Sequence, residues 1–199
     1  MQSPRDGQPV LVHLASGIGN VVLATPLVQV LGRHGFTVDV LVDGDYAETA
    51  DLLHGWSGIR SVLNGQRSKP SGARYSNVIP AIPPFYWPRY ASAYTACARA
   101  VPRPSDDLFY RDEQGYYLEF AKSLGCKIEN PCYYFLPIPP DRDYRVTSAT
   151  LVLAPGCKTG EMASKRWPYF LELSERFEDV IVVGTKDDLR RFDGSPMEF

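Results

Sequence analysis

Apolar positions along the first half of the chain fall into short runs separated by amphipathic stretches. Four runs have the length and β-branched content of strands: residues 9 to 14, 37 to 42, 59 to 63 and 76 to 79. Between the first two runs, residues 20 to 33 repeat apolar side chains at helical spacing, and a second helix is predicted to begin near Tyr46. Strands that alternate with helices predict an α/β fold, in which helices cover both faces of a parallel sheet.

The opening pattern of an apolar run, a glycine turn and a helix recurs about 140 residues later. Leu151 to Leu153 form the second run, Gly156 lies in the turn, and a helix is predicted from Pro168, followed by a strand at Val180 to Val183. A proline-rich stretch before this repeat marks residues 137 to 148 as a linker. We therefore predict two Rossmann-like domains, residues 1–145 and the beginning of a second at 146–199.

Two intermediate segments have a different pattern. Residues 80 to 88 are rich in proline, which donates no ladder hydrogen bond, so we expect them to leave the sheet as a loop. This loop either lines an acceptor pocket or is a plain connection. Residues 113 to 124 predict a helix that Gly125 ends, with Tyr116, Tyr117 and Phe120 in the core.

Composition narrows the class of protein. The chain is 44% hydrophobic and 22% charged, which is typical of a globular domain, and its net charge of -2 gives no general attraction for nucleic acid. Neither a membrane-spanning run nor a signal-peptide core is found, so we predict a cytoplasmic protein and leave peripheral membrane contact open. The four cysteines have no metal-ligand spacing, and we expect no metal ion and no cofactor.

The first glycine turn has the chemistry of an anion or ligand site. A strand that enters a helix through glycines leaves backbone N–H groups exposed at the helix N-terminus. Gly17 and Gly19 match the first two glycines of a dinucleotide fingerprint, but Val22 occupies the third, which argues against a nicotinamide cofactor. Asn20 is placed to cap the helix, and Pro26 predicts a kink inside it.

The stretch from Gly17 to Leu27 resembles the opening motif of family 9 glycosyltransferases, the ADP-heptose:lipopolysaccharide heptosyltransferases and their relatives. The stretch Lys165-Arg166-Trp167-Pro168 resembles their second motif, and the strand and turn from Val180 to Gly184 follow it. This resemblance implies a GT-B fold, with the acceptor held by the first domain and the nucleotide sugar by the second. It also implies inverting, metal-independent transfer of a heptose-like sugar to a glycan or lipopolysaccharide-type acceptor.

The resemblance also implies roles for single residues. Where the heptosyltransferases carry an aspartate proposed as the base, this chain has Asn20. Either Asn20 positions the acceptor and another carboxylate, such as Asp43 or Asp45, acts as the base, or the substrate chemistry differs. The acceptor-side loop is Gly17, Ile18 and Gly19. Trp167 is expected to anchor its helix in the core. The donor diphosphate is expected at Gly156, Lys158, Thr159, Lys165 and Arg166.

Three functions follow from these patterns. The first is a glycosyltransferase that takes a nucleotide sugar, with an ADP-sugar preferred, and a glycan or lipid-linked glycan. The second is a noncatalytic half that binds acceptor or nucleotide, and the third is an NAD-dependent oxidoreductase. The later Asp-Thr-Gly or Asp-Ser-Gly motif of the family, with its histidine, does not occur in these 199 residues. We therefore expect this stretch alone to transfer no sugar.

Overall fold

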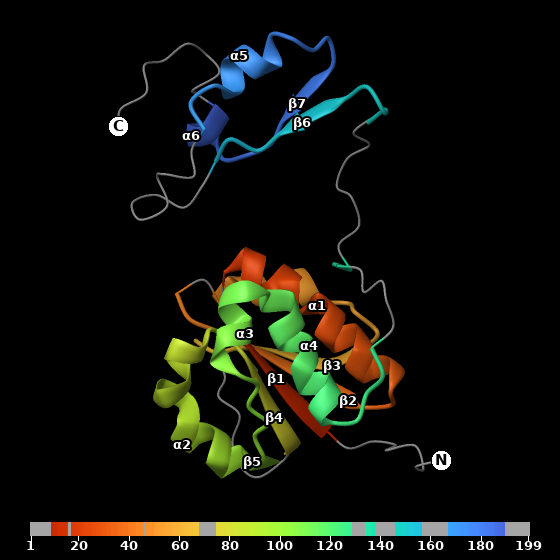
Figure 1. The fold of residues 1–199 in the computed structure, drawn as a ribbon, viewed down its shortest axis with the longest axis vertical. Helices are drawn as coiled ribbons and strands as arrows, with labels where there is room; N and C mark the ends of the chain where they lie inside the picture. Colours follow the sequence, from red (N-terminus) through yellow and green to blue (C-terminus); the bar gives the residue numbers. More distant parts are fainter. Residues whose placement is uncertain are drawn as a thin grey trace. The chain divides into compact units, whose positions relative to one another are not determined.

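The structure is a computed structural model, and it describes residues 9–15, 17–45, 47–67, 75–128, 134–137, 146–156 and 167–189. The chain divides into two compact units, Met1–Pro139 and Pro140–Phe199. The first unit holds most of the described helices and strands (Figure 1).

A five-stranded parallel sheet forms the centre of the first unit (Figure 1). In spatial order β3, β2, β1, β4, β5, its strands are Ile59–Asn64, Thr37–Asp43, Pro9–Ala15, Tyr75–Ala81 and Ala98–Ala100. Because the strands are parallel, Ala15, Asp43 and Ala81 end at the same edge. The order changes direction between β1 and β4, and open α/β sheets bind ligands outside the carboxyl ends of their strands at such a switch point.

Helices cover both faces of this sheet, as the sequence predicts. Helices α1 and α4 and the 3-10 helix η1 pack with the alternate residues Val10, Val12 and Leu14 of β1. On the opposite face, Tyr94 of α2 packs against Leu11. The helical elements of this unit are α1 (Ile18–Arg33), η1 (Ala47–Leu53), η2 (Pro84–Tyr86), α2 (Trp87–Cys97), α3 (Asp106–Arg111) and α4 (Glu113–Ser123).

Strand β4 continues through Pro80, so the expected break at this proline is wrong. Pro80 is in register with His13 of β1, while β5 pairs with β4 only at Tyr75 and Asn77. At Pro80, β4 therefore has a strand partner on one side only. Proline, which donates no ladder hydrogen bond, is tolerated at such edge positions.

Helix α1 runs without a restart from Ile18 to Arg33, with Pro26 inside it. Proline lacks the N–H that would bond the carbonyl of Val22 four residues earlier. The hydroxyl of Thr25 donates to this carbonyl at 2.8 Å. The same hydroxyl accepts from the backbone N–H of Phe135 at 3.1 Å, so Thr25 also ties a distant segment to the helix.

Two buried polar side chains of the sheet are satisfied by partners from other elements. The carboxylate of Asp39 accepts two hydrogen bonds from Arg60, at 2.9 and 2.6 Å, and one from the Tyr75 hydroxyl at 2.9 Å. The Nδ1 atom of His13 lies 2.6 Å from the Tyr94 hydroxyl. Burial lowers the pKa of His13 to about 4, although the charge of Asp43 opposes this shift.

The second unit contains a parallel pair of strands, β6 (Leu151–Leu153) and β7 (Val180–Val182), with helices α5 (Phe170–Ser174) and α6 (Lys186–Leu189). Pro168 and Tyr169 form a turn, so the helix begins two residues later than predicted. Trp167 is 47% exposed, and the expectation that it anchors the helix in the core is wrong. Its ring instead meets Tyr169 and Phe170, with centroids 5.7 and 5.3 Å away.

Replacing Thr25 with valine tests the role of its hydroxyl. The change keeps the side-chain volume but leaves the carbonyl of Val22 and the N–H of Phe135 without this partner. We expect the free energy of unfolding to fall by about 1–3 kcal/mol. Thr95→Val is the control. Its exposed hydroxyl also donates to a carbonyl three residues earlier, but no proline has left that carbonyl without its N–H partner. Equal effects of the two substitutions in urea denaturation would contradict the assignment.

The low pKa of His13 predicts an acid-labile core. Between pH 6.5 and about 4, the unfolded chain takes up a proton at this imidazole and the folded chain does not, so stability falls as the pH is lowered through this interval. His13→Gln should remove this dependence, which amounts to roughly 3 kcal/mol at most. Chemical denaturation of both proteins at several pH values measures how the free energy of unfolding depends on pH. His54→Gln, at an exposed histidine beside Asp51, is the comparison variant.

Candidate functional site

The glycine turn after β1 brings the start of α1 to the carboxyl edge of the sheet. Gly17 precedes the helix, and Ile18 and Gly19 are exposed in its first turn. A Cβ atom at Gly17 would lie 2.7 Å from Oδ1 of Asn20, so a side chain there would require the Asn20 carboxamide to move. The first amides of a helix have no intrahelical acceptor, and here they lie beside the sheet's switch point.

Asn20 does not cap α1, and this prediction is wrong. The helix begins at Ile18, two residues before the predicted start, so Asn20 already lies inside its first turn. Its Nδ2 atom donates to Oε1 of Glu113, 93 residues further along the chain, at 2.6 Å. The half-buried carboxamide therefore joins α1 to α4.

Glu113 accepts a second hydrogen bond at the same oxygen. The hydroxyl of Tyr117, one turn further along α4, donates to Oε1 at 2.6 Å. Burial raises the pKa of Tyr117, and its hydrogen bond to Glu113 raises it further. Asp112 fixes the start of α4 by accepting from the Gly115 N–H at 2.9 Å. Within the described residues, Oε2 of Glu113 has no hydrogen-bond partner.

Asp43 lies at the end of β2, next to the last residue of β1. Its Oδ1 atom accepts from the Gly44 N–H at 2.8 Å, and a Cβ atom at Gly65 would meet the carboxylate. Burial raises the pKa of Tyr90, and the charge of Asp43 raises it further. The ring of Tyr90 lies edge-on to His13, with centroids 4.6 Å apart. Asp43 therefore belongs to a polar cluster on the α2 face, while Asp45 is exposed.

Most of the predicted donor site lies outside the described residues: Lys158, Thr159, Lys165 and Arg166. Gly156 is described, and a Cβ atom there would lie 2.4 Å from Oδ2 of Asp188. Asp188 accepts at this oxygen from the N–H and hydroxyl of Thr185, at 2.9 and 2.7 Å. Gly156 thus lies against the capped start of α6.

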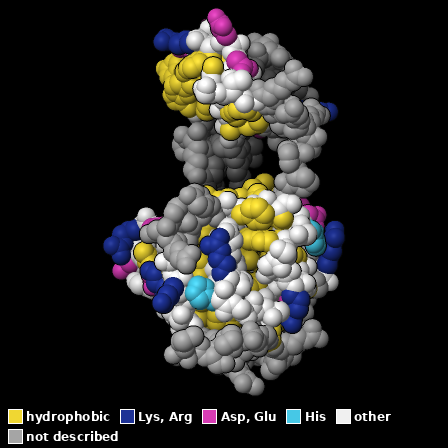
Figure 2. Space-filling view, turned by 90° about the vertical axis from the view of Figure 1, so that its right-hand side faces the viewer, with side chains coloured by type: hydrophobic (Ala, Val, Ile, Leu, Met, Phe, Trp, Pro, Cys, Tyr) yellow, Lys and Arg dark blue, Asp and Glu magenta, His cyan; other side chains and the backbone are white. Residues whose placement is uncertain are grey.

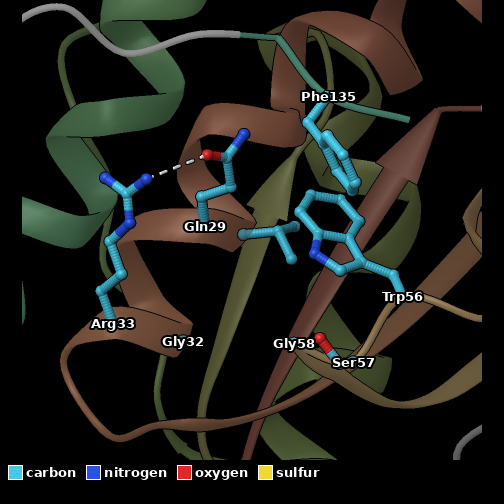
Figure 3. Close-up of a pocket in the computed structure, with 8 residues that line it drawn as sticks. Gln29, Gly32, Arg33, Trp56, Ser57, Gly58 and Phe135 are labelled. Carbon is cyan, nitrogen blue, oxygen red and sulfur yellow. Dashed lines mark hydrogen bonds between the residues drawn. The ribbon is translucent and has the colours of Figure 1, made fainter. Parts of the chain in front are cut away.

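A separate hollow lies at the opposite, amino-terminal edge of the sheet. It is lined by the end of α1, including Gln29 and Arg33, and by residues 56–58 before β3 (Figure 3). The ring of Phe135 covers it from one side and meets Trp56 edge-on, with centroids 5.2 Å apart (Figure 3). This hollow is distinct from the carboxyl-edge site.

The distribution of basic side chains on the surface of the first unit bears on the kind of ligand it can bind. On the face of the first unit seen in Figure 2, Lys and Arg side chains are spread out and form no continuous basic patch. The net charge of -2 likewise gives no general attraction for a polyanion. Within the described ranges, no helix combines the length and apolar content needed to cross a bilayer.

The contact between Asn20 and Glu113 predicts that Asn20→Asp destabilises the fold. Two carboxylates would then meet at hydrogen-bond distance, and both cannot stay ionised without repulsion. We expect a loss of about 1–2 kcal/mol at pH 7 that shrinks in acid. The exchange Asn20→Asp with Glu113→Gln restores one amide and one carboxylate, and should recover most of the loss. Chemical denaturation of the single and double variants decides this, and an additive result would contradict the contact.

Among known proteins, similarity to this chain is found at the level of the fold. No family model matches the sequence, and a search of curated proteins found no match. Among solved structures, a family 9 glycosyl transferase from Veillonella parvula is 15% identical with a TM-score of 0.60, and the match covers 98% of this chain and 67% of that one. E. coli heptosyltransferase WaaC, solved with ADP, is 17% identical over 92% of this chain and 69% of that one, with a TM-score of 0.52.

A second WaaC structure, with ADP-2-deoxy-2-fluoro heptose, gives 16% identity and a TM-score of 0.53, over 92% of this chain and 71% of that one. At these identities the likeness establishes the fold. The predicted fold class is therefore confirmed: a Rossmann-like parallel sheet covered by helices, as in GT-B-like glycosyltransferases, followed by a second α/β unit.

Proposed function

We propose that this chain is a glycosyltransferase, which moves a heptose-like sugar from a nucleotide diphosphate to a glycan or lipopolysaccharide-type acceptor. The observation that carries the proposal is the glycine turn at the carboxyl edge of the sheet, beside two carboxylates, Asp43 and Glu113. Glycosyl transfer needs a group that takes a proton from the acceptor hydroxyl. The fold shared with family 9 glycosyl transferases, including heptosyltransferase WaaC, supports this reaction class.

We assign the acceptor to the first domain, residues 1–145, where Gly17, Ile18 and Gly19 line the turn and Asn20 helps to position the acceptor. The nucleotide sugar is assigned to the second domain, residues 146–199. An ADP-sugar is the preferred donor, because ADP and an ADP-sugar analogue are bound in the WaaC structures. Transfer would invert the anomeric centre without a metal ion, as the sequence resemblance implies.

The donor site is assigned to Gly156, Lys158, Thr159, Lys165 and Arg166. In this site, Lys165 would hold the diphosphate through a charge-assisted hydrogen bond. Such a contact favours release of the nucleoside diphosphate, since negative charge grows on its oxygen as the bond to the sugar breaks.

A noncatalytic half that binds acceptor or nucleotide is a second candidate. The chain corresponds to 67% to 71% of the length of the similar structures, and its sequence lacks the later Asp-Thr-Gly or Asp-Ser-Gly motif. This candidate shares the binding properties of the first and differs in having no turnover.

Calorimetric titration of the chain with ADP tests the donor assignment. Lys165→Ala should weaken ADP binding about tenfold or more, because one charge-assisted contact is worth roughly 1.5–3 kcal/mol. Lys122→Ala is the control, since it removes the same charge from an exposed pair with Glu119 on α4. Equal ADP affinity in the wild type and Lys165→Ala would overturn the assignment. Tighter binding of NAD than of ADP would favour an oxidoreductase.

A further inference from the structure

The reaction proposed above needs a base, and Asn20 cannot serve as one. A carboxamide has no basic oxygen or nitrogen of useful strength, so it cannot take the proton of an acceptor hydroxyl at neutral pH. The base therefore has to come from a neighbouring side chain. Three described carboxylates are candidates: Asp43 on the α2 face, Asp45 two residues after the end of β2, and Glu113 at the start of α4, of which Asp45 is exposed.

We propose that Glu113 is the general base, and that Asn20 and Tyr117 orient it. This inference rests on the proposed glycosyltransferase function. Its basis is the geometry of one carboxyl group: Oε1 accepts both the Asn20 amide and the Tyr117 hydroxyl at 2.6 Å, while Oε2 has no partner within the described residues. One oxygen is fixed to the protein, and the other is left to bind an acceptor hydroxyl.

The supports of Glu113 are themselves fixed. Tyr117 is buried in the core with Val21 and Phe120, and Glu113 is held at the first position of α4 by the Asp112 cap. Asn20 belongs to the same helical turn as Gly17 and Ile18, to which the acceptor is assigned. A base placed by two helices that pack on each other keeps its orientation without help from the substrate.

Asp43 is less suited to the same task. Its Oδ1 atom accepts from the Gly44 N–H, and its charge adds to burial in raising the pKa of Tyr90. Its charge further acts on buried His13. These interactions place Asp43 beside Tyr90 and His13 on the α2 face.

The proposed transfer involves only the acceptor, the nucleotide sugar and the Glu113 carboxylate. The acceptor O–H bond breaks and its proton passes to Oε2 of Glu113, while the acceptor oxygen forms a bond to the anomeric carbon. The bond from that carbon to the diphosphate oxygen breaks, and its electron pair leaves with the nucleoside diphosphate. Glu113 then returns the proton to solvent.

Removing only the charge of Glu113 tests the base. In Glu113→Gln, Oε1 can still accept from Asn20 and Tyr117, but the side chain can no longer take a proton. We expect the rate of transfer from ADP-heptose to fall at least a hundredfold, and the acid limb of its pH profile to disappear. ADP affinity should stay within twofold of the wild type. Glu119→Gln on the same helix, bonded to Lys122, is the control and should keep the wild-type rate.

The assay uses the longest natural protein that contains these 199 residues, with enzyme in excess of ADP-heptose and a lipopolysaccharide core acceptor. The exchange variant, Asn20→Asp with Glu113→Gln, should recover at least a tenth of the lost rate, because it returns a carboxylate to the same pair of side chains. A wild-type rate in Glu113→Gln, or loss of the acid limb in Asp43→Asn alone, overturns the role of Glu113 and leaves the proposed function standing. No transfer by the wild type contradicts both proposals and favours the noncatalytic half.

Discussion

The pairing of β1 on both of its edges is the constraint on which the first unit depends. This strand lies in register with β2 on one side and β4 on the other, and its side chains are buried alternately toward α1 and α4 or toward α2. A strand buried on both faces must be apolar almost throughout, and the one polar side chain at its centre, His13, needs the hydroxyl of Tyr94. Because every neighbour is parallel, the same pairing places the glycine turn, Asp43 and Ala81 at one edge.

Local features of this arrangement are predictable from the sequence, because they depend on neighbouring residues. The apolar runs predict β1, β2 and β3 to within two residues, and the helix from Glu113 ends before Gly125, which has a φ of 80°. The element near residue 47 is a 3-10 helix, which the apolar spacing alone does not separate from an α-helix. The error at Asn20 has a local cause too: its average preference is for a cap, but the helix begins two residues earlier. At Pro26 the helix does not restart, and the Thr25 hydroxyl bonds the carbonyl that the proline leaves without its N–H partner.

The candidate site was predictable only in part, because its main contact joins residues 93 positions apart. The glycine turn and Asp43 are visible in the sequence, since each follows an apolar strand. The sequence does not single out Glu113, because a glutamate at the start of an aromatic-rich helix is typically a solvent-exposed carboxylate of the first turn. Its identity as a site residue comes from the packing of α4 on α1, which buries Tyr117 and carries Glu113 to Asn20. A spacing rule within one helix cannot supply this information.

The hydrogen bond between Asn20 and Glu113 also constrains how such a site can change during evolution. A carboxamide and a carboxylate can exchange places between the two helices, but the exchange takes two mutations. One order passes through a pair of carboxylates that repel each other, and the other passes through a pair of amides that can still bond. The second path keeps the fold intact at every step. That path nevertheless loses the proposed base in its intermediate, so if relatives of this chain have exchanged the two groups, residues 20 and 113 should vary together.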